Sequence, residues 1–292
     1  MSEPSFTVGI IGAGTMGSGI TTVMVRSGHR TVLRDTNAEC LVTGGHNVAR
    51  FLDKSVSIGK MSSAEARRAK DNLVLSAQDA DLSECDVVVE AIHEDLKAKQ
   101  ELFRHLSDVC KPETLFHTNT STLSVTAIAA GASNPERVVG THYCNPAPLM
   151  KLVEVVRGQL TSDDTYSRTI GFIASLDKKS VTTKDVPGFI VNRFLIPFEN
   201  NCIRSLESGV GTVESIDLAV RHGLRHPMGP FTLLDIVGLD VHRAVSLSLY
   251  EQLRDPRFAP PPLVERMVAA GQLGRKVGQG FYNYDQAGLI GT

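Results

Sequence analysis

The sequence has little net charge and no long apolar run. Its 30 lysine and arginine residues against 32 aspartate and glutamate residues leave a formal charge of -2, a balance that gives no general affinity for nucleic acids or membranes. No stretch reaches the roughly 18 to 20 uninterrupted apolar residues that a membrane span needs. We therefore expect neither nucleic acid nor membrane as a partner.

Cysteines are also few. The five of them are odd in number, widely spaced and without a C-x-x-C pair, which fits reduced thiols in a cytosolic protein better than disulfides or a zinc site. The first residues, Met1 to Pro4, are polar and lead directly into a strand-like segment, so we expect no signal peptide. These features predict a cytoplasmic protein without a bound metal.

The 292 residues, 42% of them hydrophobic and 21% charged, are those of a globular protein with one large domain or two ordinary ones. Up to about residue 184, short Val/Ile-rich runs alternate with longer helical stretches, the pattern of parallel strands joined by crossover helices. The predicted strands are 6–11, 31–35, 86–91, 114–118, 137–141 and 151–156.

A turn-forming break at Asp185 to Gly188 separates this pattern from helix-like apolar spacing. We expect residues 1–185 to form a Rossmann-type α/β domain with a mostly parallel sheet, and residues 186–292 an all-α C-terminal domain. The apolar helix faces exceed what one such layer buries internally, which suggests a homodimer through the C-terminal domain. The predicted helical segments are 189–206, 213–220, 231–253 and 263–270.

A G-x-G-x-x-G motif ends the first apolar strand and precedes a helix. Gly12 permits the tight turn, Gly14 lets the backbone approach a pyrophosphate, and Gly17 allows close packing of helix on strand. Glycine-rich turns are common, but the strand-turn-helix setting predicts a dinucleotide site with the helix N-terminus aimed at the phosphates. The expected contacts are Gly12, Ala13, Gly14, Thr15, Met16 and Gly17.

Asp35 ends the second predicted strand, about twenty residues further on, where a carboxylate can accept hydrogen bonds from the adenosine ribose. Its charge would repel the 2′-phosphate of NADP, so the predicted cofactor is NAD. The adjacent Arg34 works against that preference. The alternative is that Asp35 merely ends a strand.

Three polar residues follow or interrupt later strands: Ser121 in N-T-S-T, His142 in G-T-H-Y-C-N-P and Glu154 in L-V-E-V-V. A carboxylate in an apolar strand is costly to desolvate without a partner, and His142 is the nearest candidate. An imidazole, with an intrinsic pKa of about 6.5, can take a hydroxyl proton as hydride leaves the same carbon. The alternatives are a packed histidine and a solvent-facing glutamate.

In these and other segments the chain resembles the L-3-hydroxyacyl-CoA dehydrogenase family, and is similar to its bacterial short-chain, 3-hydroxybutyryl-CoA type. The resemblance covers nearly the whole chain. The segments that carry it are 12–17, 89–95, 119–121, 142–148, 152–154, 187–193, 227–231, 274–276 and 280–282.

The resemblance implies an NAD-dependent oxidoreductase that interconverts (S)-3-hydroxyacyl-CoA and 3-ketoacyl-CoA. It implies that His142 is the general base and Glu154 its partner, while Ser121 and Asn192 hold the reacting oxygen or the thioester. A hydroxyl and an amide can stabilise developing charge on oxygen, although a turn-capping serine and a helix-start asparagine are ordinary structural roles too. Further cofactor contacts are implied for Asp35, Glu94, Lys99, Ser121, Asn145 and Lys276. Without the resemblance, Glu94 and Lys99 are typical of solvated helix charges.

Two positions depart from the family. After His142 the family usually has two aromatic residues, where this chain has Tyr143 and Cys144, so the wall near the acyl group is expected to differ. Phe51 replaces a serine common in the mitochondrial enzymes, in the helix expected to contact CoA. Lys54 is the candidate for binding the acyl-CoA substrate at its phosphates, with Lys60 nearby, and acyl chain length stays open.

The sequence leaves two other functions open. The same fold could act on a non-thioester hydroxy acid such as gulonate or carnitine, or the chain could bind NAD without catalysis. The intact set Ser121, His142, Glu154 and Asn192 argues against the second of these. No nucleophile elbow supports a hydrolase.

A metal site at His222 and His226 has the spacing of one helix turn but lacks the glutamate of H-E-x-x-H. Gly223 and Pro227 moreover predict that a helix ends there. We expect no metal.

Overall fold

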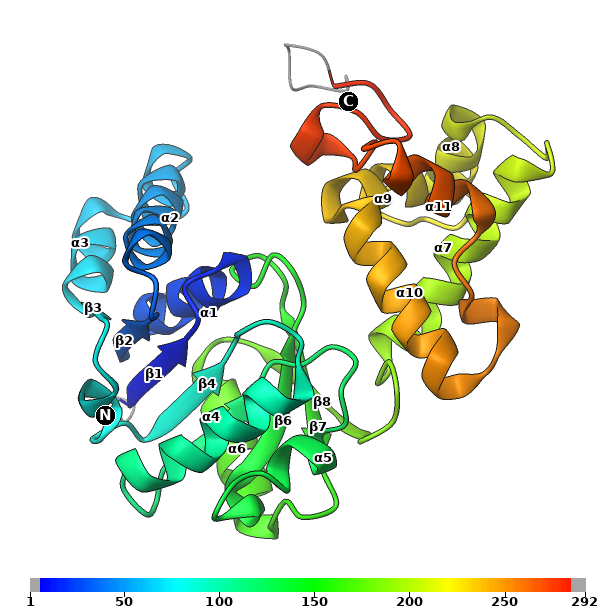
Figure 1. Cartoon of the computed structure of the whole chain (residues 1–292). Helices are drawn as coiled ribbons and strands as arrows, with labels where there is room; N and C mark the ends of the chain where they lie inside the picture. The colour runs from blue at the N-terminus through cyan, green and yellow to red at the C-terminus, as the bar shows by residue number, and fades with distance from the viewer. Residues whose placement is uncertain (1–5, 285–292) are drawn as a thin grey trace. The chain divides into compact units, whose positions relative to one another are not determined.

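The computed structural model describes residues 6–284. The chain divides into two compact units, the first ending at Phe189 and the second beginning at Ile190 (Figure 1).

The first unit is built on an eight-stranded sheet in the order β3-β2-β1-β4-β5-β6-β7-β8. Neighbouring strands run parallel except β6 and β7, which are antiparallel. The strand order reverses beside β1 and β4, and in such sheets ligands bind at the carboxyl ends of the strands at this point. The strands are β1 Thr7–Ile11, β2 Arg30–Arg34, β3 Leu73–Ser76, β4 Val87–Glu90, β5 Leu115–Thr118, β6 Val138–Tyr143, β7 Leu152–Arg157 and β8 Lys179–Lys184.

Helices cover both faces of this sheet (Figure 1). One apolar core includes Ile20 and Met24 of the first helix with Phe172 of α6, and the other includes Phe103 of α4 with Phe116 of β5. Burial on both faces explains why strands such as β1 (T-V-G-I-I) and β4 (V-V-V-E) are rich in Val and Ile. The helices are α1 Thr15–Arg26, α2 Ala38–Ser57, α3 Ser63–Asp71, α4 Leu96–Val109, α5 Val125–Ala129 and α6 Asp163–Ser175, with short 3₁₀ turns η1 Asp79–Leu82 and η2 Pro135–Arg137.

The second unit is helical, with a core around Ile203, Phe231 and Leu239. The predicted helix 231–253 is wrong as one segment, because Gly238 at φ 101° ends α9 and begins α10. The elements are α7 Val191–Glu207, α8 Val213–Gly223, α9 Pro230–Val237, α10 Leu239–Leu253, η3 Pro256–Phe258, α11 Pro262–Ala269 and η4 Arg275–Val277.

The expected fold class, a Rossmann-type mostly parallel sheet followed by helices, is confirmed. The edge strands β3 and β8 are not predicted by the sequence pattern. None of the helices within residues 6–284 combines the length and hydropathy that crossing a membrane requires.

Candidate active site

The glycine-rich turn between β1 and α1 is shaped by two close backbone approaches. Gly12 has φ +98°, and a β-carbon there would lie 2.6 Å from the carbonyl oxygen of Ala91. A β-carbon on Gly17 would lie 1.7 Å from the carbonyl oxygen of Gly12. Gly14, in contrast, has no protein atom within 4 Å of that position. The turn is thus closed toward the protein at Gly12 and Gly17 and open at Gly14, before the N-terminus of α1, as a bound pyrophosphate requires.

Asp35 follows β2 and ties this turn to it. One carboxylate oxygen accepts from the backbone N–H of Ala13 at 2.7 Å, and the other from that of Asn37 at 2.8 Å. The guanidinium of Arg34 is turned to Asp79, 2.6 Å away. Arg34 is therefore paired with another acidic residue, and its positive charge weighs less against the expectation of NAD over NADP.

His142 and Glu154 occupy opposite positions on the antiparallel strands β6 and β7. Imidazole Nδ1 lies 2.7 Å from Glu154 Oε2, and Nε2 lies 3.1 Å from the Ser121 hydroxyl. Glu154 is fully buried, and the ring of Phe189 packs edge-on against the imidazole with centroids 5.6 Å apart. The pairing of His142 with Glu154 expected from the sequence is present, and Ser121 joins it.

Glu94 supports the loop that carries Ser121. Its Oε1 accepts from the Ser121 N–H at 2.9 Å, the Thr122 N–H at 3.0 Å and the Thr120 hydroxyl at 2.6 Å. Burial raises the pKa of Glu94, but the charge of Lys99 and these hydrogen bonds outweigh it and lower that pKa below its ordinary value. Glu94 is therefore an ionised acceptor at neutral pH.

Lys99 is not a solvated helix charge, and that interpretation is wrong. Only 1% of its side chain is exposed, and its ammonium lies 2.5 Å from Glu90 and 3.3 Å from Glu94. Glu94 lies in the loop before α4, not in a helix. Glu90, a further member of this site, was not predicted from the sequence. The signal for it was an acidic residue at the end of the apolar run V-V-V-E, because a buried carboxylate needs a partner.

The residues after His142 line the wall beside α1. Tyr143 is buried in the core, whereas Cys144 is half-buried, and burial followed by the charge of Glu154 raises the pKa of the Cys144 thiol to about 11. Asn145 lines a pocket of about 370 Å³ together with Thr15 of α1 and Phe51 of α2. Asn145 and the glycine-rich turn therefore lie close together.

An adjoining pocket of about 330 Å³ shares Pro148 with the first. Its basic residues differ in how far they are paired: Lys151 forms an ion pair with Asp177, and Lys178 donates to two backbone carbonyl groups. Arg26 makes one long hydrogen bond, 3.4 Å, to the Pro148 carbonyl.

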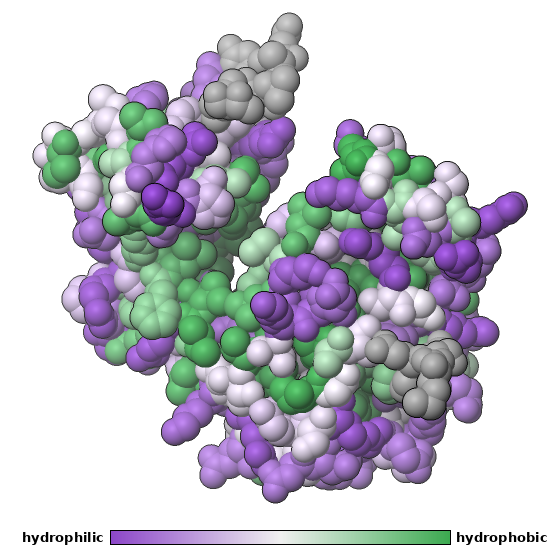
Figure 2. Space-filling model, turned by 180° about the vertical axis from the view of Figure 1, so that it is seen from behind, coloured by the Kyte–Doolittle hydropathy of each residue, from purple (hydrophilic) through white to green (hydrophobic). Residues whose placement is uncertain are grey.

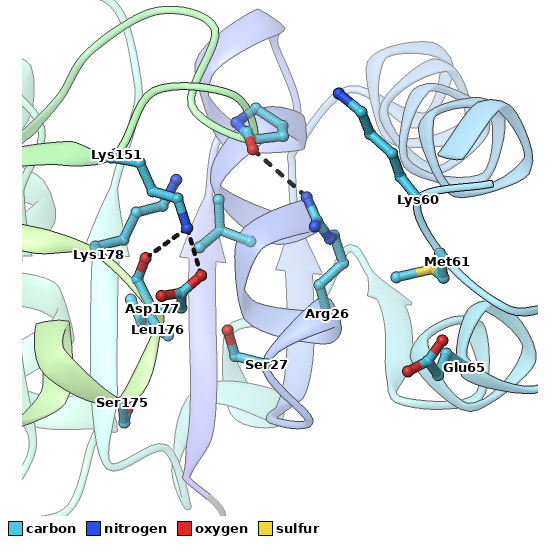
Figure 3. A pocket seen from close by; sticks show the side chains of 12 residues that line it. Arg26, Ser27, Lys60, Met61, Glu65, Lys151, Ser175, Leu176, Asp177 and Lys178 are labelled. Atoms are coloured by element: carbon cyan, nitrogen blue, oxygen red, sulfur yellow. Dashed lines mark hydrogen bonds and ion pairs between the residues drawn. The ribbon is translucent and has the colours of Figure 1, made fainter. Parts of the chain in front are cut away.

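Figure 3 shows Arg26 and Lys60, from different elements, extending their charged ends toward the same side of this pocket. Lys60 lines the pocket, and Lys54, on the exposed surface of α2, is not among its lining residues.

Two residues expected at the site belong to the second unit. Asn192 lies in the first turn of α7, three positions after Phe189 in the chain. Lys276 lies in η4 and pairs with Asp240 at 2.5 and 2.6 Å.

The predicted helix end after His222 is also found, since α8 ends at Gly223 and His226 lies beyond it. Across residues 6–284, no group of three or more His, Cys, Asp or Glu side chains could hold a metal ion.

A glycine turn at the switch point of a parallel sheet, an acid after β2, and an imidazole held between a carboxylate and a hydroxyl define a nicotinamide-dependent dehydrogenase. The model of the 3-hydroxyacyl-CoA dehydrogenase NAD-binding domain matches residues 7–186, and that of the C-terminal domain of the same enzymes matches residues 188–284. The chain belongs to the 3-hydroxyacyl-CoA dehydrogenase family.

Relatives and solved structures agree with this assignment. A 3-hydroxybutyryl-CoA dehydrogenase of Bradyrhizobium diazoefficiens is 41% identical over 98% of this chain and 97% of its own length. The crystal structure of Mycobacterium tuberculosis FadB2 superposes with a TM-score of 0.93 at 39% identity, covering 96% of this chain and all (100%) of the other. That of (S)-3-hydroxybutyryl-CoA dehydrogenase PaaH1 from Ralstonia eutropha gives a TM-score of 0.90 at 37% identity, covering 97% and 100%.

Proposed function

We propose that the chain interconverts short-chain (S)-3-hydroxyacyl-CoA and 3-ketoacyl-CoA with NAD, with 3-hydroxybutyryl-CoA and acetoacetyl-CoA as the substrate pair. The observation that carries the proposal is the arrangement at His142, whose two ring nitrogens face Glu154 and Ser121 at 2.7 and 3.1 Å. The names of the full-length relatives support the short acyl chain.

In the proposed mechanism His142 is the general base. An ionised carboxylate only accepts hydrogen bonds, so Nδ1 carries the proton toward Glu154 and Nε2 is left to accept one. In the oxidative direction Nε2 takes the proton of the substrate's 3-hydroxyl, and the buried Glu154 stabilises the imidazolium that results. Ser121 and Asn192 donate to the reacting oxygen or the thioester. Bound NAD supplies the acceptor for the hydride that leaves C3.

The residues of the first unit fit NAD. The open position at Gly14 leaves room for the pyrophosphate at the start of α1, and Asp35 has a carboxylate at the end of β2 for the ribose. We propose that Gly12 to Gly17, Asp35, Glu94, Lys99, Ser121, Asn145 and Lys276 form the cofactor site.

For the CoA end we propose a cationic site around Arg26 and Lys60, whose charged ends share one side of the adjoining pocket (Figure 3). CoA carries a diphosphate and a 3′-phosphate, and these groups need cations that are not already paired. Lys54, exposed on α2, remains a proposed contact for the same phosphates.

We further propose that residues 1–185 and 186–292 are the two domains and that the protein acts in the cytoplasm.

We also propose that the second unit forms a homodimer. Figure 2 shows apolar side chains, in green, gathered on the face of this unit that is turned to the viewer. Phe194, Val210 and Leu224 are 74%, 77% and 62% exposed in the single chain, more than such residues usually are. Sedimentation of wild type and Phe194→Asp tests this: a wild-type monomer would contradict it.

The test of function is the loss of NADH absorbance when acetoacetyl-CoA is added. Free acetoacetate is the matched control because it lacks the thioester and CoA. Turnover of the thioester alone supports the proposal; preference for a free acid such as gulonate or for carnitine indicates the second activity, and absence of all turnover indicates an NAD-binding protein without catalysis.

A further inference from the structure

We propose that Glu90 and Lys99 are positioning residues that hold the Ser121 hydroxyl at His142, acting through Glu94. The expected effect on kcat rests on the proposed function. The expected effect on the conformation of the Ser121 loop does not depend on the substrate. The continuous set of contacts from Glu90 through Lys99 and Glu94 to residues 120–122 is here called the carboxylate–lysine chain.

The carboxylate–lysine chain begins with Glu90, at the carboxyl end of β4. Glu90 is fully buried, and its two oxygens accept from the Ile92 N–H at 2.9 Å, the Thr118 hydroxyl at 2.6 Å and the Lys99 ammonium at 2.5 Å. Thr118 is the last residue of β5, so Glu90 is fixed by two adjacent strands. A buried carboxylate with three donors, one of them an ammonium group, is held in one orientation.

Lys99 transfers this fixed position to Glu94. Its side chain crosses from α4 with 1% exposed, and its ammonium lies between Glu90 and Glu94. A lysine buried to this extent requires compensating negative charge, and the two carboxylates supply it. Lys99 therefore holds Glu94 through Oε2 and leaves Oε1 directed at the loop after β5.

That loop depends on Glu94 for its conformation. A single oxygen, Oε1, accepts from both N–H groups of Ser121 and Thr122 and from both hydroxyls of Thr120 and Thr122. The Ser121 hydroxyl is then 3.1 Å from His142 Nε2. Moving Glu94 would release two backbone donors and shift the hydroxyl, so Glu90 and Lys99 control Ser121 without touching it.

The experiment compares Glu90→Gln, Lys99→Met and the double variant with a matched control, Lys111→Met. Lys111 pairs with Asp86, the residue immediately before β4, at 2.7 Å, so the control also removes a lysine–carboxylate pair, at the opposite end of β4 from Glu90. The double variant removes both the Lys99 ammonium and the Glu90 carboxylate, so neither is left buried without the other. It can therefore be measured even if Lys99→Met alone fails to fold. Amide hydrogen exchange of residues 119–123 is measured without substrate or cofactor, followed by kcat, by KM for acetoacetyl-CoA and by NADH affinity.

We expect faster exchange confined to residues 119–123 in Glu90→Gln and in the double variant, with Lys111→Met unchanged. At saturating NADH we expect kcat to fall between roughly tenfold and a hundredfold with a nearly constant KM, as for a displaced catalytic group.

Three outcomes overturn the proposal. Exchange that rises evenly over the first unit would mean that the pair is only structural. A weaker NADH affinity with wild-type kcat at saturation would mean that Lys99 serves only the proposed cofactor site and does not position Ser121. Wild-type kcat and loop exchange in the double variant would show that the pair is dispensable. An inactive wild type would count against the proposed function instead, because the exchange result does not depend on turnover.

Discussion

Glu154 stands directly opposite His142 across the antiparallel strands β6 and β7, and its carboxylate lies 2.7 Å from imidazole Nδ1. Residues opposite each other in such strands have closely spaced side chains. The orientation of the imidazole is therefore set by the register of the sheet rather than by a loop. Ser121, which lies at the other ring nitrogen, depends on loop conformation instead.

His142→Gln should abolish turnover and spare NADH binding. Glutamine can hydrogen-bond but cannot take the substrate's proton at neutral pH, so we expect kcat to fall by about 10² to 10⁴. The measurement is steady-state reduction of acetoacetyl-CoA, with NADH affinity from fluorescence titration.

A matched control is His29→Gln. His29 is also a buried histidine, but its ring lies against Phe6 and Phe172. This variant should lose stability and keep its kcat. Undiminished turnover in His142→Gln would refute the general-base assignment.

Asp35→Asn should relax the preference for NADH over NADPH. The amide oxygen of asparagine can still accept from the Ala13 N–H, which Asp35 holds at 2.7 Å, so the turn should survive. The exposed N–H of Asn37 loses its carboxylate acceptor and bonds to water instead. The negative charge that opposes a 2′-phosphate is lost. We expect the ratio of kcat/KM for NADPH to that for NADH to rise by about tenfold or more, the effect of roughly 1.4 kcal/mol. An unchanged ratio would show that Asp35 only ends its strand.

Gly14→Ala and Gly17→Ala should separate cofactor binding from folding. A methyl group at Gly17 collides with the Gly12 carbonyl at 1.7 Å, so we expect a loss of about 1 to 3 kcal/mol in the free energy of unfolding. A methyl group at Gly14 meets no protein atom within 4 Å, so stability should be kept while NADH affinity falls. Thermal unfolding and NADH titration of both variants measure the two effects. Equal NADH affinity in Gly14→Ala and wild type would contradict the proposed phosphate position.

The sequence predicted the centre of the sheet better than its edges. Central strands such as V-V-V-E are apolar because both of their faces are covered, and this pattern is visible in the sequence. The edge strand β8, K-S-V-T-T-K, is largely exposed and β3 has only four residues. Neither contains enough buried positions to produce a strand pattern, so their pairing depends on neighbours distant in sequence.

The site was predictable where it depends on local spacing. Gly12 to Gly17 and Asp35 follow a fixed pattern, and the mismatch of Glu154 with its apolar strand required a partner such as His142. The carboxylate–lysine chain was not predictable in this way. Lys99 has the spacing of an ordinary helix charge, and its burial becomes evident only when α4 packs beside the end of β4. The pairing of Arg34 with Asp79 likewise joins residues far apart in the sequence.

Cys144 should resist alkylation in the folded protein. Burial and the nearby Glu154 charge raise the pKa of its thiol from 9.0 to about 11, and the thiolate is the reactive form. At pH 8 the thiolate fraction is then roughly a hundredfold smaller than for an unperturbed thiol, so iodoacetamide should label Cys144 slowly while exposed Cys40 reacts first.

The raised pKa of the Cys144 thiol also makes the stability of the folded protein depend on pH. Because the pKa of the Cys144 thiol is higher in the folded than in the unfolded chain, its contribution to stability is complete below pH 9 and is lost as the pH rises toward about 11. Mass spectrometry of peptides labelled at pH 8, with Cys40→Ser to remove the fast site and with denatured protein as the reference, measures the rate. If Cys144 is labelled as fast in the folded as in the denatured chain, the wall beside His142 is open to solvent. An aromatic residue at position 144, as the family usually has there, would then change access to the acyl group.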